Sequence, residues 1–306
     1  MKRRVSTAKK IFAAITSATA LTLSFWANPT LAQDPFRTNN PRPIGEKTEA
    51  AFKAIFEQGD YLAAERYLQQ AQSSEPQEPL AYAMQASLAY TLKEDFNSLE
   101  SYGRKTLEVA KQLMAKDPLR GNLYAAVGHF LQGAAVISRE GTVKGMTQAL
   151  AELRQVYEYM DKAEAVSPSD PELNLLRGYM DLMLATNLPF ANPDQAITRL
   201  EKFAGPKHLA YRGLAIAYRD LKQHPQAIAA VDQAIQSAPE NPELYYLKAQ
   251  ILASQGKRQN NQLLLREAVE HFDKAIAKKT QLPVSLVKQI ERERRKTAQR
   301  IGQPQP

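Results

Sequence analysis

The side chains that most often carry out chemistry are few and scattered in this sequence. Four histidines stand singly along the chain: His129, His208, His224 and His271. None has the His-x-x-x-His or His-Glu-x-x-His spacing that places two metal ligands on one helix face. The sequence also has no glycine-rich phosphate loop and no Gly-x-Ser-x-Gly nucleophile motif. We therefore predict a protein that is not an enzyme, with no metal, no cofactor and no small-molecule substrate.

The chain contains no cysteine. This composition excludes disulfides, thiolate metal sites, cysteine nucleophiles and a lipoprotein anchor. An exported protein with this composition must take its stability from a packed core.

Basic residues gather near the two ends of the chain. Residues 1–32 carry five Lys or Arg and no acid, so the net charge of +8 for the whole chain falls to about +3 for residues 33–306. The high isoelectric point therefore reflects an export signal in part, and we predict no nucleic-acid partner.

The second basic segment lies near the C-terminus. Residues 274–300 hold nine Lys or Arg but only two acids, Glu291 and Glu293. The pattern predicts a helix over residues 283–300, with Val284, Val287, Ile290 and Ala298 facing inward. The basic patch on its polar face consists of Lys288, Arg292, Arg294, Arg295 and Lys296. This segment is either a solvent-facing helix that caps the fold, or a surface for anionic lipid headgroups or an acidic partner.

The N-terminus has the three parts of a secretory signal peptide. Lys2, Arg3, Arg4, Lys9 and Lys10 precede a mainly apolar run over residues 11–27. Small residues around Ala32 then offer a cleavage site before Gln33. The alternative is a retained membrane anchor, because a run of about 17 residues is at the lower limit for spanning a bilayer. We expect cleavage, and a periplasmic or otherwise exported protein.

One spacing recurs along the rest of the chain. An apolar triplet at steps of four and three residues is followed, five residues later, by proline. Such steps put three side chains on one face of a helix, and the proline ends that helix. The complete copies are Ala64, Leu68, Ala71 and Pro76; Val156, Met160, Ala163 and Pro168; and Ala227, Val231, Ala234 and Pro239. Incomplete copies are Ala196, Leu200 and Phe203, and Ala268, Phe272 and Ala275. The chain is therefore predicted to be an array of helical repeats.

The best unit spans residues 208–240 and resembles the tetratricopeptide repeat (TPR), a helix-turn-helix of 34 residues. The residues that carry the resemblance are Tyr211, Leu214, Ala215, Tyr218, Ala227, Val231, Ala234 and Pro239. The sequence of residues 205–215 and 239–246 resembles that of exported TPR proteins of uncharacterised function from cyanobacteria. This resemblance implies a location in the bacterial periplasm or the thylakoid lumen. Repeats of this kind stack, because no single repeat buries its own apolar face.

The resemblance implies an all-α fold: a right-handed superhelical stack of about six antiparallel hairpins with a C-terminal capping helix. The expected organisation is a signal peptide (1–32), a proline-rich linker (33–44), the repeats (45–280), the basic capping helix (281–300) and a disordered tail (301–306). The repeat register stays open between residues 79 and 168. About seven extra residues near 256–261, and an insertion at 187–193, lengthen two units.

The first helices of such repeats line a concave groove. The family's groove positions, carried over to the later units, are Leu175, Tyr179, Leu182, Arg212, Ile216, Arg219, Tyr246 and Gln250. Arginine pairs with carboxylates and tyrosine offers rigid contact area, so this groove suits a peptide with apolar and acidic side chains. Alternatively, Tyr179 and Tyr246 pack between adjacent hairpins. The family's carboxylate clamp needs Lys and Asn where this chain has Arg212 and Ile216, so that ligand is not predicted.

Two functions follow from these features. The first is an exported, non-enzymatic scaffold that binds a peptide or a partner helix in the concave groove of its repeats. The alternative is an envelope-associated structural protein that docks on anionic lipid or wall polymer through its basic C-terminal helix. The sequence identifies neither the partner nor the oligomeric state.

Overall fold

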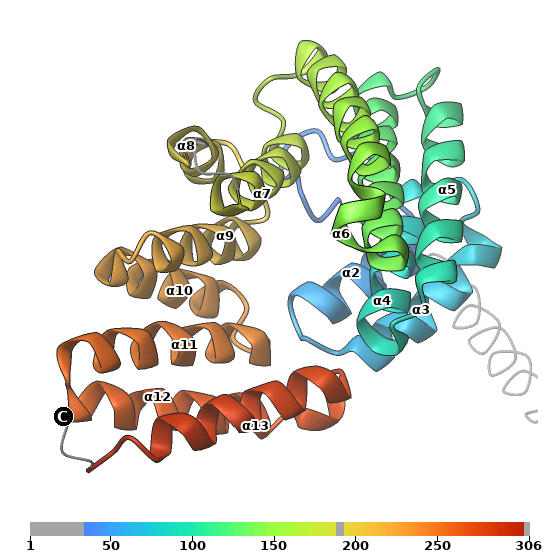
Figure 1. Ribbon diagram of the computed structural model, residues 1–306. Coiled ribbons are helices and arrows are strands. Elements are labelled where there is room, and N and C mark those ends of the chain that lie inside the picture. Colours follow the sequence, from blue (N-terminus) through green and yellow to red (C-terminus); the bar gives the residue numbers. More distant parts are fainter. Residues whose placement is uncertain (1–33, 188–192, 303–306) are drawn as a thin grey trace, which may run out of the picture.

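The computed structural model of the protein describes residues 34–187 and 193–302. The predicted signal peptide, its cleavage site and the last four residues of the tail lie outside this range. Every regular element in the described residues is helical (Figure 1). In chain order the elements are α2 (Glu46–Phe56), α3 (Tyr61–Ser74), α4 (Pro79–Lys93), α5 (Phe96–Leu113), α6 (Pro118–Val166), α7 (Pro171–Asn187), α8 (Asp194–Lys202), α9 (Lys207–Asp220), α10 (His224–Ser237), α11 (Pro242–Gln259), α12 (Gln262–Ile276), the short 3₁₀ helix η1 (Lys279–Gln281) and α13 (Val284–Ala298).

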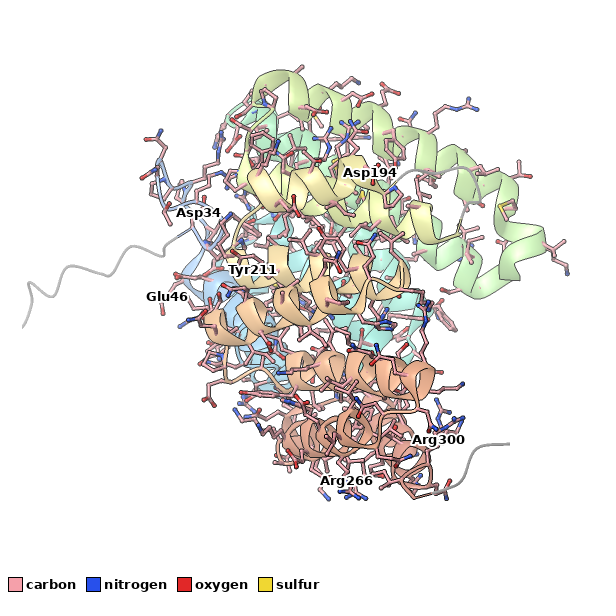
Figure 2. All side chains as sticks on the ribbon, turned by 90° about the vertical axis from the view of Figure 1, so that its left-hand side faces the viewer. Asp34, Glu46, Asp194, Tyr211, Arg266 and Arg300 are labelled. Atoms are coloured by element: carbon pink, nitrogen blue, oxygen red, sulfur yellow. The ribbon has the colours of Figure 1, made fainter. Side chains whose placement is uncertain are left out.

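Consecutive helices pair into hairpins. Within the described ranges there are six: α2–α3, α4–α5, the two arms of α6, α7–α8, α9–α10 and α11–α12, and α13 packs against the last of them. The predicted stack of about six antiparallel hairpins with a C-terminal capping helix is confirmed. Figure 2 shows the order along the stack, with Asp194 of α8, Tyr211 of α9 and Arg266 of α12 on successive layers. The right-handed twist stays a prediction.

Helix starts follow from capping chemistry. The side chain of Asp60 accepts the amide of Ala63 at the start of α3, and Asp95 does the same for Asn97 and Ser98 in α5. The side chains of Glu78, Asp117 and Asn241 cap three further helices, and in each of these the first helical residue is proline. Proline suits this position because it has no N–H, and an N–H here would have no partner within the helix. Acidic side chains therefore gather at the N-terminal ends of the first helices, where the helix dipole favours negative charge.

The recurring apolar triplet forms the core. All nine residues of its complete copies have no exposed surface: Ala64, Leu68, Ala71, Val156, Met160, Ala163, Ala227, Val231 and Ala234. Ala196, Leu200, Ala268, Phe272 and Ala275 of the incomplete copies are buried as well. Phe203 is the exception and is 42% exposed, because α8 ends at Lys202 and the side chain leaves the helix face.

Residues 79–168, where the sequence left the repeat register open, form two further hairpins, α4–α5 and the two arms of α6. The second is folded from α6, whose arms 118–140 and 142–166 run antiparallel around Gly141. Residues of the two arms meet across the hairpin: a Cβ on Gly145 would lie 3.1 Å from Val136, and a Cβ on Gly133 would lie 3.3 Å from Glu152. The glycine has φ 78° and ψ 165°, a conformation that side chains disfavour. The extra residues near 256–261 lengthen α11 to Gln259, and most of the insertion at 187–193 lies outside the described residues.

The basic C-terminal helix runs from Val284 to Ala298. Ile290 is fully buried and Val287 packs on the same cluster, as predicted. The prediction that Val284 faces inward was wrong, because its side chain is 69% exposed. Val284 is the first residue of the helix, and Leu282 occupies that part of the core instead.

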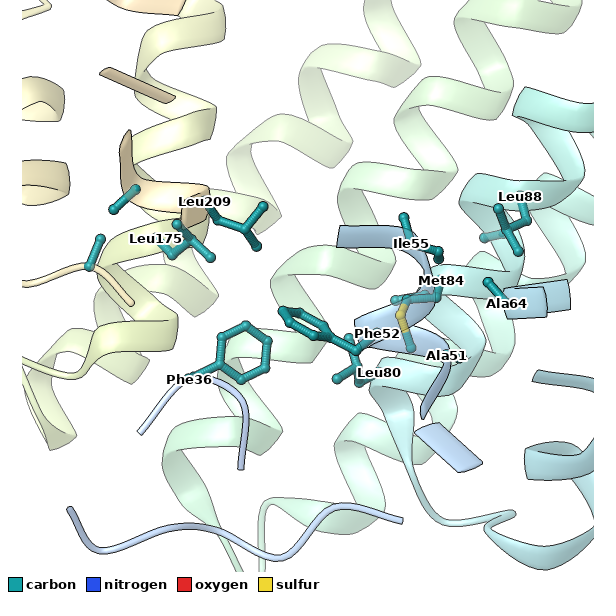
Figure 3. Packing of buried hydrophobic residues seen from close by; sticks show 14 of the residues in the cluster. Phe36, Ala51, Phe52, Ile55, Ala64, Leu80, Met84, Leu88, Leu175 and Leu209 are labelled. Atoms are coloured by element: carbon teal, nitrogen blue, oxygen red, sulfur yellow. The ribbon is translucent and has the colours of Figure 1, made fainter. Parts of the chain in front are cut away.

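Residues 34–44, which we call the N-terminal strap, pack against the repeats and do not form the free linker that the sequence predicted. The strap has no helix, but Asp34, Phe36, Arg37 and Ile44 are only 6–7% exposed. The Phe36 ring meets Phe52 edge-on at 5.0 Å between centroids, in the cluster that includes Leu175 and Leu209 (Figure 3). A proline-rich composition gives an extended chain, and here an aromatic and an arginine anchor that chain to the repeats.

Substituting Gly141 with alanine should destabilise the fold by about 1–3 kcal/mol, because φ near 78° with ψ near 165° is accessible essentially to glycine alone. A Cβ at this position would meet no atom within 4 Å, so the loss would come from the backbone and not from a clash. Urea unfolding measures it, with Lys144→Ala on the exposed second arm as the control. Equal stability of Gly141→Ala and Lys144→Ala would contradict the hairpin at Gly141.

Candidate functional site

The first helices of the hairpins form an inner row. α2 contacts α4, α4 contacts α6, α7 contacts α9, and α9 contacts α11. All the predicted groove residues lie on α7, α9 and α11, within this row. The question is which of their side chains remain available to a partner.

Leu175 and Leu182 are not available. They are 3% and 5% exposed and belong to the main hydrophobic cluster. Tyr179 is half-buried, and its hydroxyl donates to the carbonyl oxygen of Leu209 at 2.7 Å in the next hairpin. These three side chains therefore join neighbouring repeats, which is the alternative role that the sequence left open for Tyr179.

Arg212 is paired within the chain. Its Nη2 lies 3.4 Å from Oε2 of Glu243, and Oε1 of the same carboxylate accepts the hydroxyl of Tyr61 at 2.8 Å. Burial and the neighbouring carboxylate raise the pKa of Tyr61, so the hydroxyl stays protonated and donates. Because Tyr61 comes from α3, the first hairpin of the chain closes onto the inner face of the fifth and sixth.

A second contact supports this closure. The side-chain amide of Asn241 donates to the carbonyl oxygen of Phe56 at 3.0 Å. Gly59 sits on the same turn with φ 65°, and a Cβ there would lie 2.6 Å from Pro242. The turn between α2 and α3 thus rests on the N-terminal end of α11.

Arg219, Tyr246 and Gln250 form a network with the capping helix. Arg219 Nη1 donates to Gln250 Oε1 at 3.1 Å, and Tyr246 donates to Glu293 Oε1 at 2.9 Å. Burial and the Glu293 carboxylate raise the pKa of Tyr246. Ile216 is half-buried and packs on the main cluster. The sequence thus named residues that do come together, but Tyr246 and Gln250 bond to Glu293 on α13 of the same chain.

The strap carries the strongest polar cluster, which sequence reasoning missed. Arg37 donates to Asp34, Asp170 and Glu172, each at 2.8 Å, and all four side chains are at most 5% exposed. Arg42 pairs with Asp117, the residue that caps α6. The signal was present in the sequence: acids cap the first helices, and the strap has arginines among its prolines.

A second arginine extends this cluster. Arg120 donates to Glu78 Oε1 at 2.8 Å, and its Nε lies 3.4 Å from Glu172 Oε2. Tyr124 donates its hydroxyl to the other oxygen of Glu172. Burial and the Glu172 carboxylate raise the pKa of Tyr124, which keeps that proton in place. The strap is therefore tied to the starts of α4, α6 and α7.

We expect Arg37→Met to cost about 3–5 kcal/mol of stability, because it leaves the buried carboxylates of Asp34 and Asp170 without their cation and Glu172 with Arg120 alone. Urea unfolding at pH 7 reports the loss. The matched control is Arg292→Met on the exposed face of α13, for which a change within about 0.5 kcal/mol is expected. The strap would be shown not to dock if both variants unfolded alike.

An apolar cavity of about 520 Å³ opens between α4, α6 and α7. Most of its walls are aliphatic or aromatic, and the polar groups that face it include His129 and Glu152. Its lining comprises Ser87, Tyr90, Thr91, Leu99, His129, Phe130, Leu131, Gly133, Ala134, Ile137, Ser138, Ala149, Glu152, Leu153, Val156, Met183 and Leu184. Volume and lining are those of a binding pocket. None of these residues was among the predicted groove positions, because the open register of residues 79–168 hid this part of the array.

The predicted basic patch is only partly open. Arg294 is bound to Asp273 by two hydrogen bonds of 2.9 and 3.0 Å, and Arg295 lies 4.0 Å from Glu291. Lys288, Arg292 and Lys296 are exposed. Two of the five predicted charges are therefore compensated within the chain, so the patch is weaker than the sequence alone indicated.

The four histidines contact other side chains or lie in the core. His129 Nδ1 lies 2.7 Å from Glu152, and His224 Nε2 lies 3.1 Å from the hydroxyl of Ser254. His208 and His271 are buried. The part of the chain that the structure describes holds no group of three or more acidic or histidine side chains placed to bind a metal, and no helix in it is both long and apolar enough to span a bilayer.

Burial and nearby cations lower the pKa of His208 and of His271, each to about 4. The unfolded chain takes up these protons below pH 6.5 but the folded chain does not, so stability should fall on acidification between pH 6.5 and 4. The loss is about 1.4 kcal/mol per pH unit per histidine. In urea unfolding from pH 7.5 to 5.5, the double variant His208→Gln/His271→Gln should show a shallower loss. The same slope in both proteins would contradict the burial argument.

No protein-family model matches the chain, and no curated protein is similar enough to count as a relative. Several solved structures are similar to it, among them these two. One is a thermophilic TPR protein of Thermus thermophilus, with 20% identity, 79% of this chain and 92% of that chain covered, and a TM-score of 0.30. The other is a tetratricopeptide repeat protein from Parabacteroides merdae, with 16% identity, 82% and 100% covered, and a TM-score of 0.32. At such TM-scores these likenesses carry no argument, and the architecture rests on the hairpins described above.

Proposed function

We propose that this protein is a non-enzymatic scaffold for protein–protein interaction, which binds a peptide or partner helix on the inner side of its stacked hairpins. The observation that carries the proposal is the row of first helices with an apolar cavity of about 520 Å³ beside it. Stacked helical hairpins commonly use their concave side in this way. The closure by the strap and the first hairpin leaves the C-terminal halves of α4 and α7 and the middle of α6, residues 129–156, as the open part.

The proposal includes export. The basic, apolar and small-residue regions of residues 1–32 support a cleaved signal peptide and a location in the periplasm or another exported compartment, with the thylakoid lumen as one such place. A partner is therefore to be sought in the cell envelope.

The alternative function is docking on anionic lipid or wall polymer through α13. The exposed side chains of Lys288, Arg292 and Lys296 favour it. The pairing of Arg294 with Asp273 weakens it, because that charge is already compensated. Contacts of this kind are exposed and hence sensitive to salt.

One capture experiment separates the two functions. Tagged residues 33–306 are crosslinked in native envelope extract, beside the triple variant Lys288→Glu/Arg292→Glu/Lys296→Glu. All three side chains lie on the exposed face, so the core around Ile290 is kept. A scaffold of stacked repeats should hold the same protein partner in both forms and at about 0.5 M salt, where exposed charges are screened.

Capture that is lost both in the triple variant and at high salt would favour surface docking. Capture of no protein from any envelope fraction, or turnover of a substrate by the purified protein alone, would contradict the scaffold.

A further inference from the structure

The cavity beside α6 continues onto an exposed apolar stripe. Val143, Met146 and Leu150 are 93%, 41% and 54% exposed, and they follow each other at steps of three and four along the second arm of α6. Leu153, the next residue at this spacing, lines the cavity. Cavity wall and stripe are therefore one face of a single helix.

The dimensions of this face suit a helix. From Val143 to Val156 the arm advances by about 20 Å, at about 1.5 Å per residue. Tyr90 of α4 is 46% exposed and Met183 of α7 is 38% exposed, and both line the mouth of the cavity. Four large apolar side chains on or next to the cavity wall are thus exposed, Tyr90, Val143, Met146 and Leu150, and apolar surface gathered in this way marks an interaction site.

The charge that faces the cavity is negative. Among the described residues that line the cavity, Glu152 is the only carboxylate and none is Lys or Arg. Glu152 Oε2 lies 2.7 Å from His129 Nδ1, while the carboxylate keeps 20% of its side-chain surface exposed. A basic side chain on a partner complements this site, whereas an acidic one would meet Glu152.

We propose that this trough, formed by the cavity and by Val143, Met146 and Leu150, is the docking site for an amphipathic partner helix of three to four turns. The helix lays apolar side chains spaced i, i+3 or i+4, and i+7 into the cavity, and it carries Lys or Arg next to Glu152. A small ligand would fill the cavity and leave the stripe exposed. The inference rests on the proposed scaffold function and names its site and the chemistry of its partner.

This partner chemistry differs from the acidic peptide predicted for the groove. That prediction used Arg212 and Arg219, and the structure pairs Arg212 with Glu243 and holds Arg219 against Asp220 and Gln250. Both arginines are held by acidic or amide groups of the chain, while Glu152, whose neighbour is His129, lines the cavity.

The test uses labelled peptides and residues 33–306. The probe is an amphipathic helix of about 18 residues with leucines at i, i+3/i+4 and i+7 and lysines on its flanks, and its two twins carry glutamine or glutamate in place of lysine. Fluorescence anisotropy should show saturable binding of the lysine peptide, weaker binding of the glutamine twin and the weakest binding of the glutamate twin.

Two substitutions in the cavity then locate the site. Ala149→Trp fills the cavity and should weaken binding of every peptide tenfold or more. Glu152→Gln keeps the shape and should weaken only the lysine peptide, by about 3- to 10-fold, down to the level of the glutamine twin. Ala229→Trp, on the exposed face of α10, is the matched control and should bind as the unmodified protein does. Unfolding midpoints confirm that each variant is folded.

Equal binding of the lysine peptide by Ala149→Trp and Ala229→Trp would overturn the site, and equal binding of the lysine and glutamate peptides would overturn the partner's charge. A dimer in sedimentation that Ala149→Trp dissociates would make a second copy of the chain the occupant and overturn the partner helix.

Capture with Ala149→Trp separates this inference from the scaffold. An envelope partner that the filled cavity still retains leaves the scaffold intact and refutes this site. A lysine peptide that binds in the trough, with no partner captured from any envelope fraction, supports the site while the scaffold fails.

Discussion

The arrangement of this protein depends on one buried ionic cluster. Arg37 lies among Asp34, Asp170 and Glu172, and Arg120 joins Glu172 to Glu78. Each carboxylate except that of Asp34 belongs to the start of a first helix, where the helix dipole and the capping geometry favour an anion. Burying these anions together is unfavourable unless cations accompany them, and the strap and α6 provide the cations. The cluster therefore fixes the strap against three hairpins at once.

This constraint decides which surfaces remain for binding. The strap covers the N-terminal ends of the first helices, and the turn between α2 and α3 rests on α11. A stack of hairpins that would otherwise leave its whole concave side open is closed along one edge by its own chain. The open part shifts to the C-terminal halves of α4 and α7 and the middle of α6, where the walls are apolar and Glu152 is the single carboxylate among the described residues that line the cavity. The proposed partner follows from that shift.

The sequence predicted the part of the fold that depends on local periodicity. The triplet with its closing proline sets a buried face and a helix end, so helices could be placed from residues such as Leu68, Met160 and Val231. It could not place contacts between segments far apart in the chain. The pairing of Arg37 with Asp170, or of Tyr61 with Glu243, follows from how six hairpins curve together, and no local pattern encodes that curve. For the same reason the sequence could not show that Leu175, Leu182 and Tyr246 of the predicted groove are buried, and the groove itself stays a prediction.

The central claim is that residues 34–44 are a docked part of the repeat array. Hydrogen–deuterium exchange of these residues in the protein of residues 33–306 tests it most directly, because the amides of Phe36 and Arg42 both donate to the Asp34 side chain in the buried cluster. We expect slow exchange for peptides that cover these amides, comparable with that of the first turn of α7. Complete exchange at the shortest time point, as in an unfolded chain, would show that the strap is a linker after all and that the rim of the array is open.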